Sequence, residues 1–252
     1  MPADGAGGAP APRTGVSRTG VSQTAVSQTA ALRAAGVVLG VRPAERDQVT
    51  GPAGTFAPGR RVLVLGGARS GKSTTAERFL AGHGEVEYVA TGMPPSEDDK
   101  EWAARVALHQ DRRPPHWRTT ETLDLEGVLG AADPAPVLVD CLSLWLARVM
   151  DECGAWEAAG PGDAGPGDGD TGDGDAGDGG AAVRARVERL LGAWRSTPRH
   201  VVAVSNEVGC GVVPATASGR LYRDALGRLN ALVAADSDEV WFCTAGLPRR
   251  LR

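Results

Sequence analysis

The chain has 252 residues, with 27 basic and 31 acidic side chains and a formal net charge of −4. This balance gives no electrostatic reason to expect a nucleic-acid surface, and the absence of a long apolar run argues against a transmembrane segment. The four cysteines, Cys141, Cys153, Cys210 and Cys243, lie far apart and form no CxxC pair. That spacing favours reduced thiols and a cytoplasmic location over a disulfide framework or a zinc site.

The first segment, residues 1–58, is predicted to be a disordered low-complexity extension. It carries few large apolar side chains and a five-residue near-repeat that starts at Thr14 (TGVSR, TGVSQ, TAVSQ, TAALR). Such a segment buries too little surface to offset the entropy lost on ordering. A targeting or regulatory role is the alternative, because the segment is poor in acidic residues, as transit peptides are.

Residues 59–252 alternate β-rich runs with helical stretches. The predicted strands are 61–65, 86–90, 137–141, 201–205 and 239–244, and the predicted helices are 73–81, 97–110, 142–150, 181–195 and 219–235. Near-continuous apolar strands between helices are typical of a mainly parallel sheet covered on both faces. We therefore predict one α/β domain over 59–252, and we expect its basic tail, GLPRRLR, to be a solvated end.

A Gly/Asp-rich insert interrupts this domain at residues 157–180. It holds seven acidic residues and no basic one, so leaving it out changes the formal charge from −4 to +3. Alternating Asp and Gly resemble a calcium repeat, but the nonapeptide register of such repeats is absent. We predict a flexible acidic loop rather than a calcium site. The mildly basic remainder suits an anionic small molecule.

The strongest motif is GGARSGKS at residues 66–73, which matches G-x-x-x-x-G-K-[ST] between a predicted strand and a predicted helix. Its glycines allow several backbone N–H groups to face one phosphate, and the helix N-terminus adds partial positive charge. Lys72 would reach the β- and γ-phosphates, Ser73 would bind Mg²⁺, and Asp140, which ends the strand VLVD, would help to hold that metal. An exposed acid at a strand end is the alternative for Asp140. The two motifs predict a P-loop NTPase-like fold that binds a nucleoside triphosphate.

One of the four histidines, His109, lies among cationic residues. On a helix it would share a face with Trp102 and Val106, and Arg112 and Arg113 follow it directly. Guanidinium groups nearby favour a neutral imidazole, which is the form that a nucleophile needs. The local sequence leaves open a second interpretation, in which His109 only completes an amphipathic face.

Several motifs that follow one another in a fixed order resemble a single known family. They are GGARSGKS, YVATG, D-D-x-E-x-x-A-R-V-x-x-H-x-x-R-R-P-x-H-W-R-T-x-E, VDCLSLWL, SNEVGCGVVP, R-x-Y-R-D-x-x-G-x-x-N and DEVWFCTAGLP. Together they are similar to the bifunctional adenosylcobinamide kinase/adenosylcobinamide-phosphate guanylyltransferases of cobalamin biosynthesis. The resemblance covers residues 61–252 without the acidic insert. The N-terminal extension and the insert have no counterpart in the family pattern.

The resemblance implies two reactions on a corrinoid substrate. Adenosylcobinamide would be phosphorylated with ATP or GTP, and GMP would then pass from GTP through a guanylylated histidine to adenosylcobinamide phosphate. The resemblance also implies Mg²⁺ and a homotrimer. It places the guanylylated histidine on His109, beside Lys72 and Asp140 as the other catalytic positions. The implied nucleotide-binding residues are Gly66, Gly67, Ala68, Arg69, Ser70, Gly71, Lys72, Ser73, Thr91, Gly92, Gln110, Asp111, Arg112, Arg113, Glu121 and Asp140, and the implied metal ligands are Ser73 and Asp140.

Two other functions remain open from the residues alone. One is a P-loop small-molecule kinase without guanylyltransferase activity, and the other is a regulatory nucleotide-binding protein whose acidic insert recruits a partner. Asn206 and Glu207 follow a predicted strand, at the end where open α/β sheets bind ligands. We predict a substrate or subunit-interface role for residues 205–214, with a turn shaped only by its glycines as the alternative.

Overall fold

The computed structural model describes residues 59–94, 99–111, 113–157 and 178–252. The predicted extension, most of the acidic insert and Arg112 lie outside these residues. Within the part that is described, no helix is long and apolar enough to cross a membrane. All four cysteines are described and are free thiols, as their spacing predicts.

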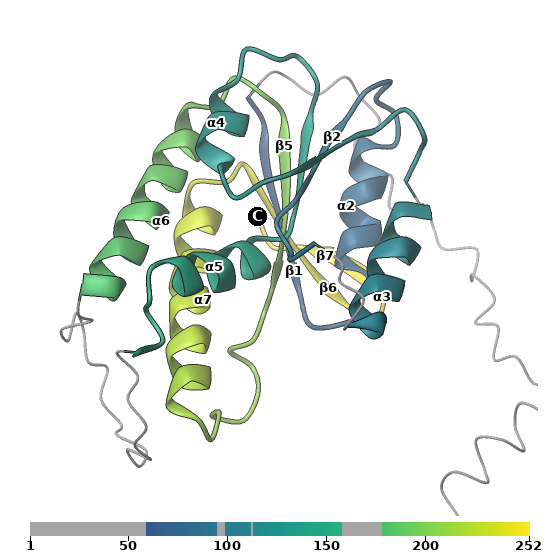
Figure 1. The fold of residues 1–252 in the computed structure, drawn as a ribbon. Coiled ribbons are helices and arrows are strands. Elements are labelled where there is room, and N and C mark those ends of the chain that lie inside the picture. Colours follow the sequence, from purple (N-terminus) through teal and green to yellow (C-terminus); the bar gives the residue numbers. More distant parts are fainter. Residues whose placement is uncertain (1–58, 95–98, 112, 158–177) are drawn as a thin grey trace, which may run out of the picture. The chain divides into compact units, whose positions relative to one another are not determined.

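The described residues form one seven-stranded sheet with helices on both faces (Figure 1). The strands are β1 (Arg61–Gly66), β2 (Glu87–Ala90), β3 (Arg118–Glu121), β4 (Val137–Asp140), β5 (Val201–Asn206), β6 (Glu239–Thr244) and β7 (Leu247–Arg250). Their order in the sheet is β3-β2-β4-β5-β1-β6-β7. Every neighbouring pair is parallel except β6 and β7, which confirms the mainly parallel sheet.

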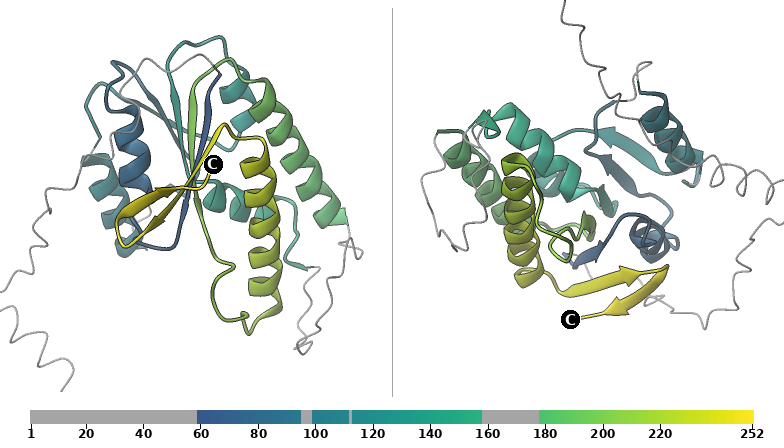
Figure 2. Two further views of the ribbon diagram at one scale, coloured as in Figure 1. Left: turned by 180° about the vertical axis from the view of Figure 1, so that it is seen from behind. Right: turned by 90° about the horizontal axis from the view of Figure 1, so that it is seen from below.

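Helices cover the two faces of the sheet unequally. They are α2 (Lys72–Leu80), α3 (Lys100–Asp111), α4 (Leu125–Gly130), α5 (Leu142–Glu152), α6 (Asp178–Ser196) and α7 (Ala217–Ala235). α2 packs on β1, β4, β5 and β6, and α3 lies on the same side, whereas α4 to α7 lie on the other side (Figure 2). This arrangement confirms the α/β fold with both faces covered.

The alternation of side chains along β1 explains why its sequence is apolar throughout. Val62 and Val64 pack with Leu80 of α2 on one face. Leu63 and Leu65 join Trp145 and the other apolar side chains under α4 to α7. Because successive residues of a strand point to opposite faces, a strand buried on both sides needs apolar residues at every position.

Three elements were not predicted from the sequence. β3 (RTTE) is a mostly exposed edge strand without an apolar face, and α4 spans only six residues. The tail was expected to be a solvated end, and most of its side chains are exposed, but its backbone is part of the sheet, because β7 pairs antiparallel with β6. Arg252 also donates to the carbonyl oxygens of Ala234 and Ala235 at the end of α7. In addition, α6 begins at Asp178, so the last three residues of the predicted insert are helical.

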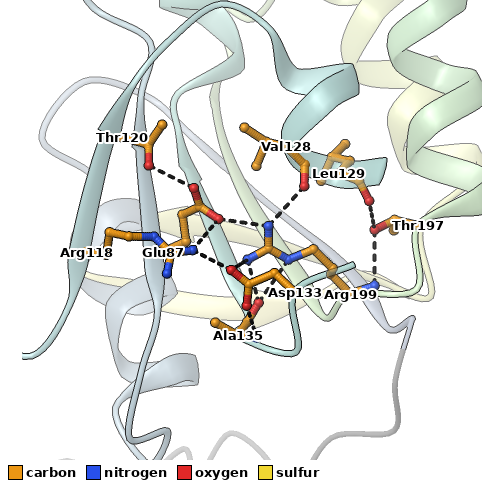
Figure 3. Close-up of polar contacts among 9 residues, drawn as sticks. All are labelled: Glu87, Arg118, Thr120, Val128, Leu129, Asp133, Ala135, Thr197 and Arg199. Carbon is orange, nitrogen blue, oxygen red and sulfur yellow. Dashed lines mark hydrogen bonds and ion pairs between the residues drawn. The ribbon is translucent and has the colours of Figure 1, made fainter. Parts of the chain in front are cut away.

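A buried ionic network fixes the amino end of the sheet (Figure 3). The side chain of Arg199 donates to the carbonyl oxygens of Ala135 and Val128 and lies 2.8 Å from Glu87. Glu87 also accepts hydrogen bonds from Arg118 and Thr120. Burial alone would raise the pKa of Glu87, but these hydrogen bonds outweigh it and lower the pKa. The network joins the starts of β2, β3 and β5 and lies at the end of the strands away from the phosphate loop.

Candidate active site

A pocket of about 170 Å³ opens at the carboxyl ends of the central strands, between the loop after β1 and helix α3. Such crevices are the usual ligand sites of open parallel sheets. The pocket is lined by Lys72, Ser73, Tyr88, Ala90, Gly92, Met93, Trp102, Val106, His109, Arg113, Glu121, Asp140, Cys141, Leu144 and Asn206. It therefore unites residues that are up to 134 positions apart in the chain, from Lys72 to Asn206.

The loop from Gly66 to Ser73 has the geometry of a phosphate-binding loop. It leaves β1 at Gly66 and enters α2 at Lys72, with Gly71 as the helix N-cap. Lys72 donates from Nζ to the carbonyl oxygen of Gly67, 3.2 Å away, so the side chain folds back over the loop. The N-terminus of α2 and this ammonium group together make a site for an anion.

Two glycines of the loop are required by its backbone. Gly71 has φ of 91°, in the left-handed region that strains other residues. A Cβ atom at Gly66 would lie 2.5 Å from the Ser70 hydroxyl and 2.6 Å from the carbonyl oxygen of Cys243. The Ser70 hydroxyl is buried and makes no hydrogen bond with the described residues. The glycines of the motif are therefore required by a tight turn of the backbone, and they do more than make the loop flexible.

Ser73 and Asp140 both line the pocket and would suit Mg²⁺. A hydroxyl and a carboxylate are the oxygen ligands that this ion takes from P-loop proteins, with phosphates and waters completing the shell. Asp140 ends β4, and the Oδ2 atom of its carboxylate accepts a hydrogen bond from Tyr88, at 2.8 Å. The donor set therefore fits the metal that the sequence predicts.

Tyr88 links the acidic and the basic sides of the pocket. Burial, and then the charge of Asp140, raise the pKa of Tyr88 far above its ordinary value, so its hydroxyl is the donor to Asp140. The guanidinium carbon of Arg113 lies 3.4 Å from the centre of the Tyr88 ring. Arg113 also donates from Nη1 to the Thr119 hydroxyl, 3.0 Å away. The sequence motifs placed Asp140 and Arg113 in the site, and the motif YVATG contains Tyr88, but they gave no sign that this tyrosine touches both.

Trp102, Val106 and His109 line the pocket from α3, as their helical spacing predicts. Trp102 donates from its indole nitrogen to the carbonyl oxygen of Met93, 2.8 Å away, and this fixes the start of the helix against the loop after β2. His109 is half-buried at the end of the same face. It lines the same pocket as Lys72 and Ser73 of the phosphate loop.

Several predicted nucleotide-binding residues do not line the pocket. Thr91 is fully buried, and its hydroxyl donates to the carbonyl oxygen of Cys141 at 2.7 Å and accepts from the N–H of Cys141 at 3.0 Å. Gln110 and Asp111 are exposed on α3 and are not among the residues that line the pocket. Gly92, Arg113 and Glu121 do line it, whereas Arg112 lies outside the described residues.

Asn206 is brought into the pocket by the placement of β5. Its carbonyl oxygen accepts a hydrogen bond of 2.9 Å from the side chain of Asn230, and Asn230 also accepts one of 2.7 Å from Ser205. Asn230 is buried on α7 and thus holds the end of the strand. Beyond it, Val212 and Val213 are exposed, and Arg220 donates to the carbonyl oxygens of Pro214 and Ala215. Part of the stretch 205–214 therefore meets the pocket, and part faces outward.

Comparison with known proteins agrees with this geometry. Residues 62–251 match the family described as cobinamide kinase / cobinamide phosphate guanyltransferase. The chain is 35% identical over 194 residues to the "Bifunctional adenosylcobalamin biosynthesis protein CobU" of Salmonella typhimurium, covering 76% of this chain and 99% of that protein. It is 38% identical over 196 residues to the "Bifunctional adenosylcobalamin biosynthesis protein CobP" of Pseudomonas aeruginosa, covering 76% of this chain and 97% of that protein.

Solved structures give a weaker match. A "prototypical ATPase from the type III secretion system of pathogenic bacteria" aligns with a TM-score of 0.42 and 14% identity, over 74% of this chain and 51% of that one. The match along 62–251, together with the phosphate loop and His109 in one pocket, establishes that the chain belongs to the cobinamide kinase / cobinamide phosphate guanyltransferase family.

Proposed function

We propose that this chain phosphorylates adenosylcobinamide with ATP or GTP and then transfers GMP from GTP to the resulting phosphate through His109. The products are adenosylcobinamide-GDP and pyrophosphate, made during cobalamin biosynthesis. The family match supports both reactions. The observation that carries the proposal is that His109, Lys72, Ser73 and Asp140 line one pocket.

In the kinase step, the hydroxyl of the aminopropanol arm attacks the γ-phosphorus of the triphosphate. The P–O bond to the β-phosphate and the O–H bond of the attacking hydroxyl break, the proton passes to solvent, and negative charge develops on the oxygens of the transferred group. Lys72 and the N–H groups of the loop from Gly66 to Ser73 stabilise that charge. Ser73 and Asp140 would hold Mg²⁺, which would supply further positive charge beside the phosphates.

In the guanylyl step, a ring nitrogen of His109 attacks the α-phosphorus of GTP. A P–N bond forms, and the P–O bond to pyrophosphate breaks. An oxygen of adenosylcobinamide phosphate then attacks the same phosphorus, so that the P–N bond breaks and His109 is restored. This route replaces one displacement between two anions by two easier steps. Arg113, which lines the pocket, would bind phosphate oxygens in both of them.

The remaining partners follow from the same chemistry. The substrate is an anionic corrinoid after the first step, which suits a mildly basic chain outside the acidic insert. We propose a homotrimer, on the family resemblance, and a cytoplasmic location, which four free thiols favour. The exposed apolar residues of 208–214 would be suited to a contact with a neighbouring subunit.

Labelling with GTP that carries ³²P at the α-phosphate tests the proposal. We expect wild-type protein to retain an acid-labile, alkali-stable label, because phosphoramidates hydrolyse in acid. His109→Ala should retain none and should still transfer the γ-phosphate to adenosylcobinamide. His83→Ala is the matched control, since His83 stacks on His200 outside the pocket, with ring centres 6.0 Å apart.

The control and the mutant separate the alternatives. A label that persists in His109→Ala would refute the assignment of the nucleophile. Transfer of the γ-phosphate without any protein-bound GMP in the wild type would leave a kinase only. Nucleotide binding without turnover of either corrinoid substrate would favour the regulatory alternative.

A further inference from the structure

Tyr88 contacts two oppositely charged groups of the pocket through different parts of its side chain. It is 3% exposed, and its hydroxyl donates to Oδ2 of Asp140 at 2.8 Å. Its ring face carries the guanidinium of Arg113, 3.4 Å from the ring centre. An ionised carboxylate can only accept hydrogen bonds, and a cation is attracted to the face of an aromatic ring. One side chain therefore contacts both the carboxylate of Asp140 and the guanidinium of Arg113.

The register of the sheet builds the support for Arg113. Tyr88 of β2 pairs with Thr119 of β3, so the ring and the threonine hydroxyl lie side by side. Arg113 uses both, because it stacks on Tyr88 and donates from Nη1 to Thr119 at 3.0 Å. Its Nε atom is buried and makes no hydrogen bond with the described residues. Arg113 is thus held in place by neutral groups, and its charge is not neutralised by them.

The spacing between the two charges has a chemical consequence. Arg113 and Asp140 line the same pocket, yet within the described residues they form no ion pair with each other. If Arg113 and Asp140 formed a direct ion pair, the carboxylate would be less available to magnesium and the guanidinium would be less available to a phosphate. The hydroxyl of Tyr88 is a neutral partner for Asp140, and its ring is a neutral partner for Arg113. Both charged groups therefore remain available to a ligand in the pocket.

We infer that Tyr88 is a positioning residue that directs Asp140 toward magnesium and Arg113 toward a phosphate and keeps these two charges apart. The inference rests on the proposed function, because that function assigns the ligands of both groups. It predicts that the hydroxyl and the ring of Tyr88 have separable effects.

Two substitutions separate them. Tyr88→Phe removes the hydrogen bond to Asp140 and keeps the ring under Arg113. Tyr88→Leu removes both contacts. Tyr222→Phe is the matched control, because Tyr222 is a half-buried tyrosine whose hydroxyl donates to the carbonyl oxygen of Ser143 at 2.9 Å and does not line the pocket.

The measurement is the affinity for a non-hydrolysable GTP analogue, by calorimetry, over a range of Mg²⁺ concentrations. For Tyr88→Phe we expect the half-saturating Mg²⁺ concentration to rise about three- to tenfold, the value of one hydrogen bond, with little loss of affinity at saturating Mg²⁺. For Tyr88→Leu we expect the same shift, plus a loss of affinity of about three- to tenfold at saturating Mg²⁺ as Arg113 loses its support. Tyr222→Phe should match the wild type.

Two results would overturn the inference. One is an unchanged Mg²⁺ dependence in Tyr88→Phe, which keeps the ring and so carries the test even if Tyr88→Leu fails to fold. The other is equal affinity of the two Tyr88 variants at saturating Mg²⁺. A merely structural tyrosine would lower the melting temperature and leave the Mg²⁺ dependence unchanged. Because binding is measured without turnover, a wild type that bound nucleotide but made neither product would refute the proposed function and leave this inference standing.

Discussion

The Thr91 hydroxyl makes two hydrogen bonds with a single residue, the backbone of Cys141 that follows Asp140. The family resemblance suggested that Thr91 contacts the nucleotide. Its complete burial and this pair of bonds show that the hydroxyl fixes the chain just beyond Asp140, and the nucleotide contact stays a prediction. Side-chain burial of this kind is set by the neighbouring strand, and the motif YVATG does not reveal it.

Replacing Thr91 by valine should destabilise the protein by about 1–3 kcal/mol, because the N–H and C=O groups of Cys141 would be buried without that partner. Thr91→Ser keeps the hydroxyl, so its stability should fall much less. Urea denaturation of both variants gives the comparison. Equal stability of the valine and serine variants would show that the two bonds contribute little.

At the scale of elements, β1, the loop and α2 form the unit that sequence reasoning describes best. The strand and helix lie within one residue of their predicted ends, because an apolar run and a Gly-Lys-Ser helix start are local signals. The structure adds the reason for one glycine. Gly71 is the left-handed N-cap, and a Cβ atom there would lie 3.0 Å from the backbone of Gly246 in the turn between β6 and β7.

Gly71→Ala should therefore destabilise the protein by about 1–3 kcal/mol, the usual strain of a left-handed residue other than glycine. Gly192→Ala in α6 is the opposite case, since a Cβ atom there would meet nothing within 4 Å. The free energy of unfolding of that control should rise by about 0.5–1 kcal/mol, because alanine has a higher helix propensity than glycine. Thermal unfolding in the absence of nucleotide measures both changes. Parallel losses in the two variants would refute the explanation by strain.

In the described unit as a whole, the carboxyl and amino ends of the parallel strands carry different features. The carboxyl ends hold the pocket, while the amino ends hold the network around Arg199 and a pair of stacked histidines, His83 and His200. His200 is 5% exposed, and its Nδ1 atom lies 2.9 Å from the carbonyl oxygen of Arg60. Burial lowers the pKa of His200 from 6.5 to about 4.

This shift makes the global stability sensitive to acid. Below pH 6.5 the unfolded chain binds a proton at His200, whereas the folded chain binds it only near pH 4. Stability is therefore full above pH 6.5 and falls as the pH drops toward 4, by up to about 1.4 kcal/mol per unit for this group. The lowered pKa of Glu87 adds a further loss below its ordinary value of 4.5.

His200→Asn should flatten the dependence of the unfolding free energy on pH between 6.5 and 4, because an amide does not titrate. Its stability at pH 8 can be lower than that of the wild type, so the slope is the quantity to compare. Urea denaturation at half-unit steps of pH supplies it. A wild-type slope that persists in the variant would assign the acid sensitivity to other groups.

Several parts of this protein depend on local patterns and can be predicted from them. Apolar runs marked β1, β4, β5 and β6, helical spacing placed Trp102, Val106 and His109 on one face, and GGARSGKS identified the phosphate loop. Those features follow from residues that are neighbours in the chain, and the family resemblance added the reaction class. The edge strand β3 and the β7 pairing escaped prediction because RTTE and LPRR have no apolar face.

How these parts meet depends on contacts between segments that are far apart in the chain. The insertion of β5 between β1 and β4 brings Asn206 to the pocket, and the pairing of Tyr88 with Thr119 builds the support of Arg113. Strand order and register arise from hydrogen bonds and packing between segments far apart in the chain. No local pattern specifies such contacts, so the motifs identify the charged groups of the site but not the contacts through which Tyr88 links them.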